Sequence, residues 1–137
     1  MKENKYDDTV FFQKYSQMDR SVQGLAGAGE WPALQAMLPD FRAKRVLDLG
    51  CGFGWHCQYA MEQGAASALG LDISAKMLEE ARRKNRYDAV RYVQMPIEDI
   101  DFAPHSFDCV LSSLAFHYLA DFEAICSKIY ALLTPGG

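Results

Sequence analysis

The chain has 137 residues, of which half are apolar and 23% are charged, and its formal net charge is −4 at pH 7. This length and composition are typical of one globular domain with a substantial core. The net negative charge does not favour binding to nucleic acid, which is itself negatively charged. No apolar run reaches the ~20 residues of a membrane-spanning helix. Four separated cysteines without a Cys-x-x-Cys pair predict no metal site and suit a reducing, cytoplasmic setting.

Residues 1–40 are expected to form a helical N-terminal extension. Apolar side chains at helical spacing predict a first short helix that packs as an arm over the domain: Phe11, Phe12, Tyr15 and Met18. The glycine-rich segment 24–29 predicts a flexible connection, because glycine destabilises helices. A further helix should begin near Pro32 and end before Pro39.

The next stretch combines a strand, a glycine-rich turn and the start of a helix. The apolar run 46–49 predicts a buried parallel strand, three glycines follow at alternate positions, and helical residues begin at Trp55. Such a turn lets a ligand lie against main-chain N–H groups. A dinucleotide fingerprint has its third glycine one residue later, which argues against a nicotinamide-dinucleotide oxidoreductase. A turn with only a packing role is the other alternative.

A family resemblance is carried by nine consecutive residues, Val46-Leu47-Asp48-Leu49-Gly50-Cys51-Gly52-Phe53-Gly54. They resemble the cofactor loop of class I S-adenosylmethionine-dependent methyltransferases, most closely the small-molecule type that includes the ubiquinone and menaquinone methyltransferases. The resemblance implies S-adenosylmethionine as cofactor and S-adenosylhomocysteine as product. It assigns to cofactor binding the loop residues Asp48, Gly50, Cys51, Gly52 and Gly54, with Asp48 ordering the loop. The segment before the first strand often covers the cofactor in this family, so Tyr15 is the predicted lid contact; a packed core aromatic is the alternative.

A second buried strand is predicted over residues 66–73, and it ends in an acid. Asp72 lies 22 residues after Gly50, where a doubly wound fold uses an acid to accept hydrogen bonds from ribose hydroxyls. A helix-capping role is the alternative for Asp72. The resemblance also assigns Asp72 to the ribose and places Ile73 against the adenine ring, with Met77 near enough to share that pocket.

A third strand is predicted over residues 89–93, after a helix that Ser74 should cap. The following loop departs from the family pattern. Pro96 stands where an acid usually reaches the adenine amino group. Glu98, or alternatively Asp99, is the expected substitute for this acid, and Ile97 is the expected backbone contact to adenine.

Residues 107–113 predict a fourth strand. In the sheet order 3-2-1-4 it lies beside the first strand, and ligands of open α/β sheets bind at the carboxyl ends of such strands. Ser113 and His117 are then expected at the mouth of the site. The resemblance makes His117 the candidate base or acceptor-positioning residue; a packed or capping histidine is the alternative. The Asn/Asp-Pro-Pro-aromatic signature of base-modifying enzymes is absent here, which argues against DNA as substrate.

The chain closes with a helix that Asp121 should cap, followed by Thr134-Pro135-Gly136-Gly137. In the resembling family this last sequence leads into a fifth strand. Residues 41–137 are thus predicted to form an α/β domain, a doubly wound and mostly parallel sheet that lacks the C-terminal strands. The expected function is methyl transfer to a small molecule, without nucleic-acid or membrane partners. The alternative is a non-catalytic nucleoside-binding or dimerising module, since an uncovered sheet edge favours a homodimer.

Overall fold

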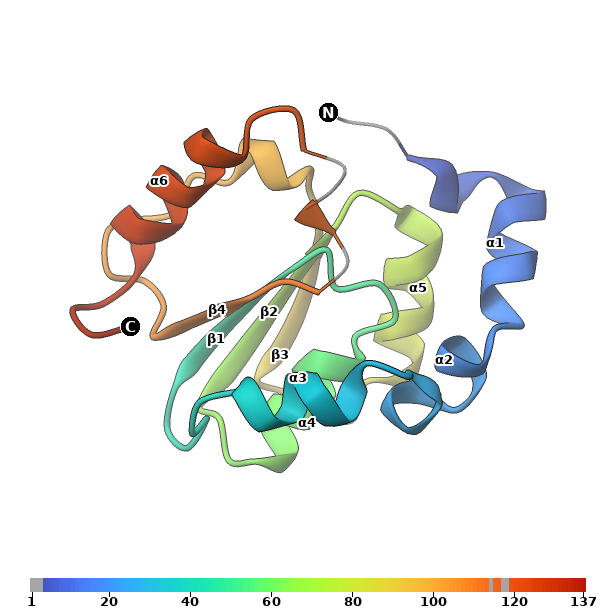
Figure 1. Ribbon diagram of the computed structural model, residues 1–137, viewed down its shortest axis with the longest axis horizontal. Coiled ribbons are helices and arrows are strands. Elements are labelled where there is room, and N and C mark those ends of the chain that lie inside the picture. Colours follow the sequence, from blue (N-terminus) through green and yellow to red (C-terminus); the bar gives the residue numbers. More distant parts are fainter. Residues whose placement is uncertain (1–3, 114, 117–118) are drawn as a thin grey trace.

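The computed structural model describes residues 4–113, 115–116 and 119–137. Its sheet has four parallel strands in the order β3-β2-β1-β4 (Figure 1). The strands are β1 (Arg45–Leu49), β2 (Ser67–Asp72), β3 (Val90–Gln94) and β4 (Cys109–Leu111). The predicted doubly wound fold and its strand order are confirmed.

Helices form the N-terminal extension and the crossovers between strands. The extension holds the 3-10 helix η1 (Lys5–Asp7), α1 (Thr9–Ser16), α2 (Asp19–Val22), the 3-10 helix η2 (Gly24–Gly27) and α3 (Trp31–Met37). The crossovers and the C-terminal part hold α4 (Trp55–Glu62), α5 (Ala75–Lys84), the 3-10 helix η3 (Ile97–Asp99) and α6 (Phe122–Leu132). In the described part of the chain, no helix has the length and apolar character to cross a bilayer.

The two faces of the sheet carry separate hydrophobic cores. Val46 of β1 belongs to the core that the buried side chains of α4 and α5 complete, namely Cys57, Ala60, Leu78 and Ala81. Leu47 and Leu49 belong to the opposite core, which includes Ile125 and Leu132 of α6. Successive strand residues point to opposite faces, so a strand covered on both sides must be apolar throughout. This explains why residues 46–49 of β1 are apolar on both faces apart from the buried Asp48.

The predicted helix caps are confirmed. The Ser74 hydroxyl accepts a hydrogen bond from the backbone N–H of Met77 at 3.1 Å, and the Asp121 carboxylate accepts one from Ala124 at 3.0 Å. Each bond satisfies one of the free N–H groups at a helix start. These caps fix where α5 and α6 begin.

The flexible connection predicted over residues 24–29 is wrong for its first four residues. Gly24–Gly27 form η2. The physical reason is a close tertiary contact: a Cβ at Gly24 would lie 3.0 Å from the indole ring of Trp55. The bare glycine backbone therefore packs directly against the first residue of α4, and this contact orders a segment that local propensity leaves open.

Candidate functional site

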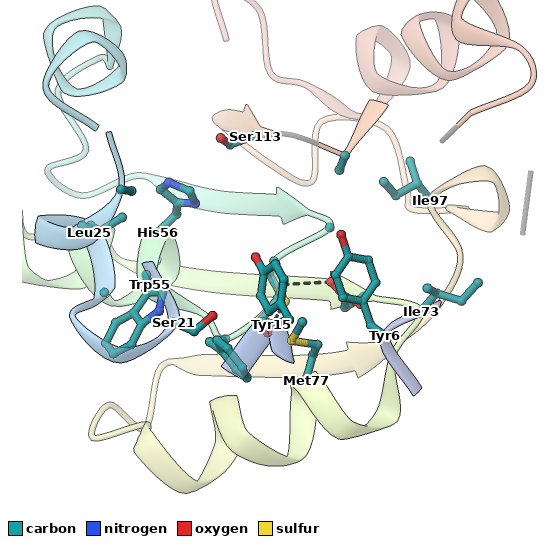
Figure 2. A pocket seen from close by; sticks show the side chains of 18 of the residues that line it. Tyr6, Tyr15, Ser21, Leu25, Trp55, His56, Ile73, Met77, Ile97 and Ser113 are labelled. Atoms are coloured by element: carbon teal, nitrogen blue, oxygen red, sulfur yellow. Dashed lines mark hydrogen bonds between the residues drawn. The ribbon is translucent and has the colours of Figure 1, made fainter. Parts of the chain in front are cut away.

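A cavity of about 390 Å³ opens at the carboxyl ends of β1 and β2, beneath the N-terminal extension. Gly50–Phe53 line it from the turn after β1, and Asp72 lines it from the end of β2. Figure 2 shows Tyr6, Ile73 and Ile97 toward one end, and Leu25 and His56 toward the other. This is the switch point of a doubly wound sheet, where crossovers leave in opposite directions and ligands bind.

Most of the site residues predicted from the sequence line this cavity: Tyr15, Gly50, Cys51, Gly52, Asp72, Ile73, Met77, Ile97, Glu98 and Ser113. Asp48 and Gly54 are not among its lining residues. His117 lies outside the described residues, so its role stays a prediction. The sequence analysis did not single out four further lining residues as site residues: Tyr6, Ser21, Trp55 and His56.

Asp72 ties the glycine-rich turn to the start of α5. One carboxylate oxygen accepts a hydrogen bond from the Gly52 N–H at 2.8 Å, and the other accepts one from the Ser74 N–H at 2.9 Å. Burial raises the pKa of Asp72, and these two hydrogen bonds only partly offset that effect. Each oxygen keeps a second lone pair, so the carboxylate can still accept hydrogen bonds from a ligand in the cavity.

Asp48 lies behind the turn and is only 1% exposed. Its Oδ2 atom accepts a hydrogen bond from the Cys57 thiol at 3.9 Å and lies 4.0 Å from Nδ1 of His56. Burial raises the pKa of Asp48 to about 7, and the charge of Asp72 adds to this effect. The carboxyl group therefore joins β1 to the first turn of α4 inside the core and is not among the cavity's lining residues.

The charged groups that line the cavity are acidic. Among the described residues, Glu30, Asp72 and Glu98 line it, and no lysine or arginine does. No group of three or more metal-ligating side chains occurs in the described part of the chain. A cavity with this charge favours neutral or cationic ligands over anions.

Two buried polar atoms at the cavity lack a hydrogen-bond partner among the described residues: the Ser21 hydroxyl oxygen and the Trp55 indole nitrogen. Both residues line the cavity, and Ser21 is 4% exposed. A buried donor without a partner costs roughly 1–3 kcal/mol, and each of these atoms can donate a hydrogen bond to an acceptor in the cavity.

The Asp7 side chain makes most of the hydrogen bonds that fasten the N-terminal arm to the start of α5, and Lys76 adds one to the Thr9 hydroxyl at 3.1 Å. The Asp7 carboxylate accepts hydrogen bonds from the Ser74 hydroxyl at 2.6 Å and from the N–H groups of Ala75 and Lys76 at 3.2 and 3.1 Å. Burial raises the pKa of Asp7, but these hydrogen bonds outweigh it and the net pKa lies below the ordinary value. Asp7 is thus a second cap of α5, and it holds Tyr6 over the cavity.

Replacing Asp7 with alanine is expected to release the arm. Three hydrogen bonds to α5 are lost, and few buried contacts remain because no residue of η1 or α1 is buried. Trypsin cleavage after Lys5 and Lys14 should become at least about tenfold faster, since cleavage follows the local opening equilibrium. Asp101→Ala, at an exposed position outside the arm, is the control. Equal cleavage rates for both variants would contradict the clamp.

The lining residues that were missed fall into two groups. Tyr6 and Ser21 belong to the N-terminal extension, which reaches the cavity through tertiary contacts such as those of Asp7 with the start of α5, nearly seventy positions away. Trp55 and His56 stand in the first turn of α4, directly after the glycines. Their position alone was a usable signal, because a helix that starts at the ligand edge of the sheet presents its first turn there.

Comparison with known proteins places this fold in a family. A protein-family model described as a methyltransferase domain matches residues 47–137 of the chain. A malonyl-[acyl-carrier protein] O-methyltransferase from Enterobacter lignolyticus is 43% identical over 105 residues, or 77% of this chain and 41% of that protein. Two further relatives are a fatty-acid O-methyltransferase and a tRNA U34 carboxymethyltransferase, so the substrates in the names of the relatives differ widely.

Solved structures agree with this match. An S-adenosylmethionine-dependent methyltransferase from Mesorhizobium loti has a TM-score of 0.80 at 46% identity, over 83% of this chain and 52% of that one. A Listeria monocytogenes protein assigned to the same class has a TM-score of 0.76 at 57% identity, over 77% of this chain and 50% of that one. The chain thus spans about half the length of the relatives it matches. Because the family model covers well over half of the sequence and these structures share its fold, the chain belongs to the methyltransferase domain family.

Proposed function

We propose that this chain binds S-adenosylmethionine in the cavity above β1 and β2 and serves in methyl transfer to a small-molecule acceptor. The observation that carries the proposal is the meeting of the Gly50–Phe53 turn and the Asp72 carboxylate at one cavity. Bare main chain suits the methionine part of the ligand, and a carboxylate suits the ribose hydroxyls. The acidic lining suits a sulfonium cation.

Each part of the ligand has a proposed partner. Apolar side chains at the Asp72 end suit the adenine ring: Ile73, Met77 and Ile97. The unpartnered donors of Ser21 and Trp55 suit the methionine carboxylate. Tyr6 and Tyr15 form an edge-to-face pair with ring centres 5.3 Å apart, and we propose that this pair covers the ligand as a lid.

The ligand supplies an electrophilic methyl group, and the chain's own contribution is alignment. Displacement at a methyl carbon requires the acceptor, the carbon and the sulfur to lie in line, so fixing both reactants supplies much of the rate. The lid excludes water, which protects a reactive sulfonium from hydrolysis. We also propose a cytoplasmic location, since the four cysteines are free thiols, as in a reducing compartment.

Calorimetric titration tests the proposal directly. The chain should bind S-adenosylmethionine and S-adenosylhomocysteine at about micromolar Kd, and NAD should not compete. Asp72→Ala should weaken binding by roughly 100-fold or more, because it removes hydrogen bonds to a charged group. The matched control Asp88→Ala changes an exposed acid outside the cavity and should bind normally. A folded chain that binds neither ligand contradicts the proposal and favours a non-catalytic module.

A homodimer through the sheet edge stays a prediction. In the described part of the chain, β4 is the last strand of the sheet, and β1 is the one strand that pairs with it. Sedimentation of the chain over a range of concentrations, with and without ligand, distinguishes a dimer from a monomer.

A further inference from the structure

The end of the cavity away from Tyr6 carries apolar side chains that the proposed cofactor contacts do not use. They come from the part of the N-terminal extension that holds η2 and α3, and Figure 2 shows Leu25 at this end beside His56. Each is only partly buried, so apolar surface is left open to a ligand. Four lining residues form this apolar wall: Leu25, Ala28, Trp31 and Leu34.

The spacing of three residues explains how the wall forms. The Ala28 N–H donates to the Leu25 carbonyl oxygen at 3.1 Å, and the Trp31 N–H donates to the Ala28 carbonyl oxygen at 3.0 Å. Each bond closes a turn, which brings the first and fourth residues within roughly 7 Å of each other. Leu34 follows Trp31 after about one turn of α3 and lies on the same side of that helix. The four side chains are therefore neighbours in space.

Trp31 anchors the apolar wall to the body of the domain. Its indole ring packs edge-to-face on Tyr59 of α4, with ring centres 4.7 Å apart, and lies 5.8 Å from the imidazole of His56. Tyr59 packs in turn against the core that α4 and α5 complete, and its hydroxyl accepts a hydrogen bond from Gln35 at 3.2 Å. The wall is thus held in place without a ligand, which lowers the entropy cost of binding one.

The chemistry of the apolar wall selects the kind of group that lies on it. An ionised group placed against it would lose its hydration and meet hydrocarbon atoms, which is costly. A hydrocarbon group gains free energy in the same place, because apolar area is removed from water on both sides. The wall therefore favours an uncharged hydrocarbon group.

Resting on the proposed function, we propose that the methyl acceptor carries an uncharged hydrocarbon body, and that Leu25 and Leu34 determine specificity by packing against it. The apolar wall and the Gly50–Phe53 turn line one cavity. An acceptor whose body lies on the wall therefore has its reacting atom in the cavity that the proposed cofactor enters. The wall selects the body of the acceptor and not its reacting atom.

A series of alkanols tests the proposal by binding. The chain is loaded with S-adenosylhomocysteine and titrated with 1-butanol, 1-hexanol and 1-octanol. The readout is intrinsic fluorescence, because the two tryptophans of the sequence, Trp31 and Trp55, both line the cavity. Each added methylene should tighten binding about three- to fourfold. The matched probe 1,8-octanediol has the same length but a polar far end, and it should bind at least about tenfold more weakly than 1-octanol.

Two pairs of variants place the binding on the apolar wall. Leu34→Gln should weaken 1-octanol binding by at least about tenfold. Met37→Gln changes a residue of the same helix that is 81% exposed and outside the lining, and it should leave binding unchanged. Leu25→Gln and its control Val22→Gln, at a position 66% exposed, form the second pair. Circular dichroism checks folding, and the second pair decides if Leu34→Gln does not fold.

The outcomes separate the two proposals. Failure of the chain to bind S-adenosylhomocysteine overturns the proposed function, and this inference with it. Binding of S-adenosylhomocysteine without binding of 1-octanol overturns the inference alone. An affinity that does not rise with alkanol length, or equal effects of the wall variants and their controls, also overturns it.

Discussion

Replacing Gly54 with alanine is expected to lower the free energy of unfolding by roughly 2–5 kcal/mol, a large share of a domain's stability. Gly54 has a φ of +82°, in the left-handed region that costs other residues about 1–2 kcal/mol. A Cβ there would lie 2.2 Å from the phenolic oxygen of Tyr92, which is buried. Displacing this packed ring adds about 1–3 kcal/mol. Urea denaturation measures the loss.

Gly52→Ala is the matched control for this prediction. Gly52 also has a positive φ, +54°, but no atom lies within 4 Å of the position of its Cβ. Only the conformational cost remains, so the expected loss is about 1–2 kcal/mol. Adding Tyr92→Phe to Gly54→Ala removes the closest atom and should recover part of the loss in a double-mutant cycle. Equal effects at the two glycines would show that the Tyr92 contact does not matter.

Replacing Asp48 with asparagine is expected to stabilise the protein at pH 8 by up to roughly 4 kcal/mol and to do little at pH 4. The pKa of Asp48 is raised from 3.8 to about 7 by burial and by the charge of Asp72. Between these two values the folded protein holds a proton that the unfolded chain releases. Wild-type stability should therefore fall as the pH rises from about 4 to about 7. Asparagine is neutral throughout and removes this dependence.

Asp108→Asn provides a comparison of opposite sign. Hydrogen bonds from the Arg45 side chain and backbone lower the pKa of Asp108 to about 2. Here the unfolded chain binds the proton more readily, so the carboxylate stabilises the fold above pH 4 and this stabilisation is lost as the pH falls toward 2. The asparagine variant should be less stable than wild type at pH 7. Urea denaturation of both variants across pH 4–8 measures the two effects, and a stabilising Asp108→Asn or a destabilising Asp48→Asn at pH 8 would contradict them.

Much of the site was predictable because its signals are local. The turn after β1 needs glycines at fixed positions, and Ser74 caps α5 through a bond that spans three residues. The position of Asp72 follows from the fold, since the ends of neighbouring parallel strands meet at one edge. Sequence reasoning placed Asp72 at that edge for this reason, and the family resemblance added Ile73 with Met77 near it; all three line the cavity.

Contacts between distant segments were not predictable in the same way. Asp7 and Ser74 are 67 positions apart in the sequence, and no local sequence pattern around either residue predicts their hydrogen bond. The side of β1 on which Asp48 lies was also hidden. Both faces of β1 are buried, so its hydrophobic pattern does not say which face meets α4 and which meets α6.

The sequence by itself determined the parallel strands and helices, the glycine turn and the acid at the end of β2, because each depends on short-range periodicity or on backbone geometry. The strand order followed from the doubly wound fold class that these elements indicated. Only the tertiary structure decided that the arm closes the cavity through Asp7, and that His56 faces the cavity with Asp48 close behind its ring. These features depend on packing between elements, where small differences in buried contact and charge select one arrangement among many that local sequence permits equally well.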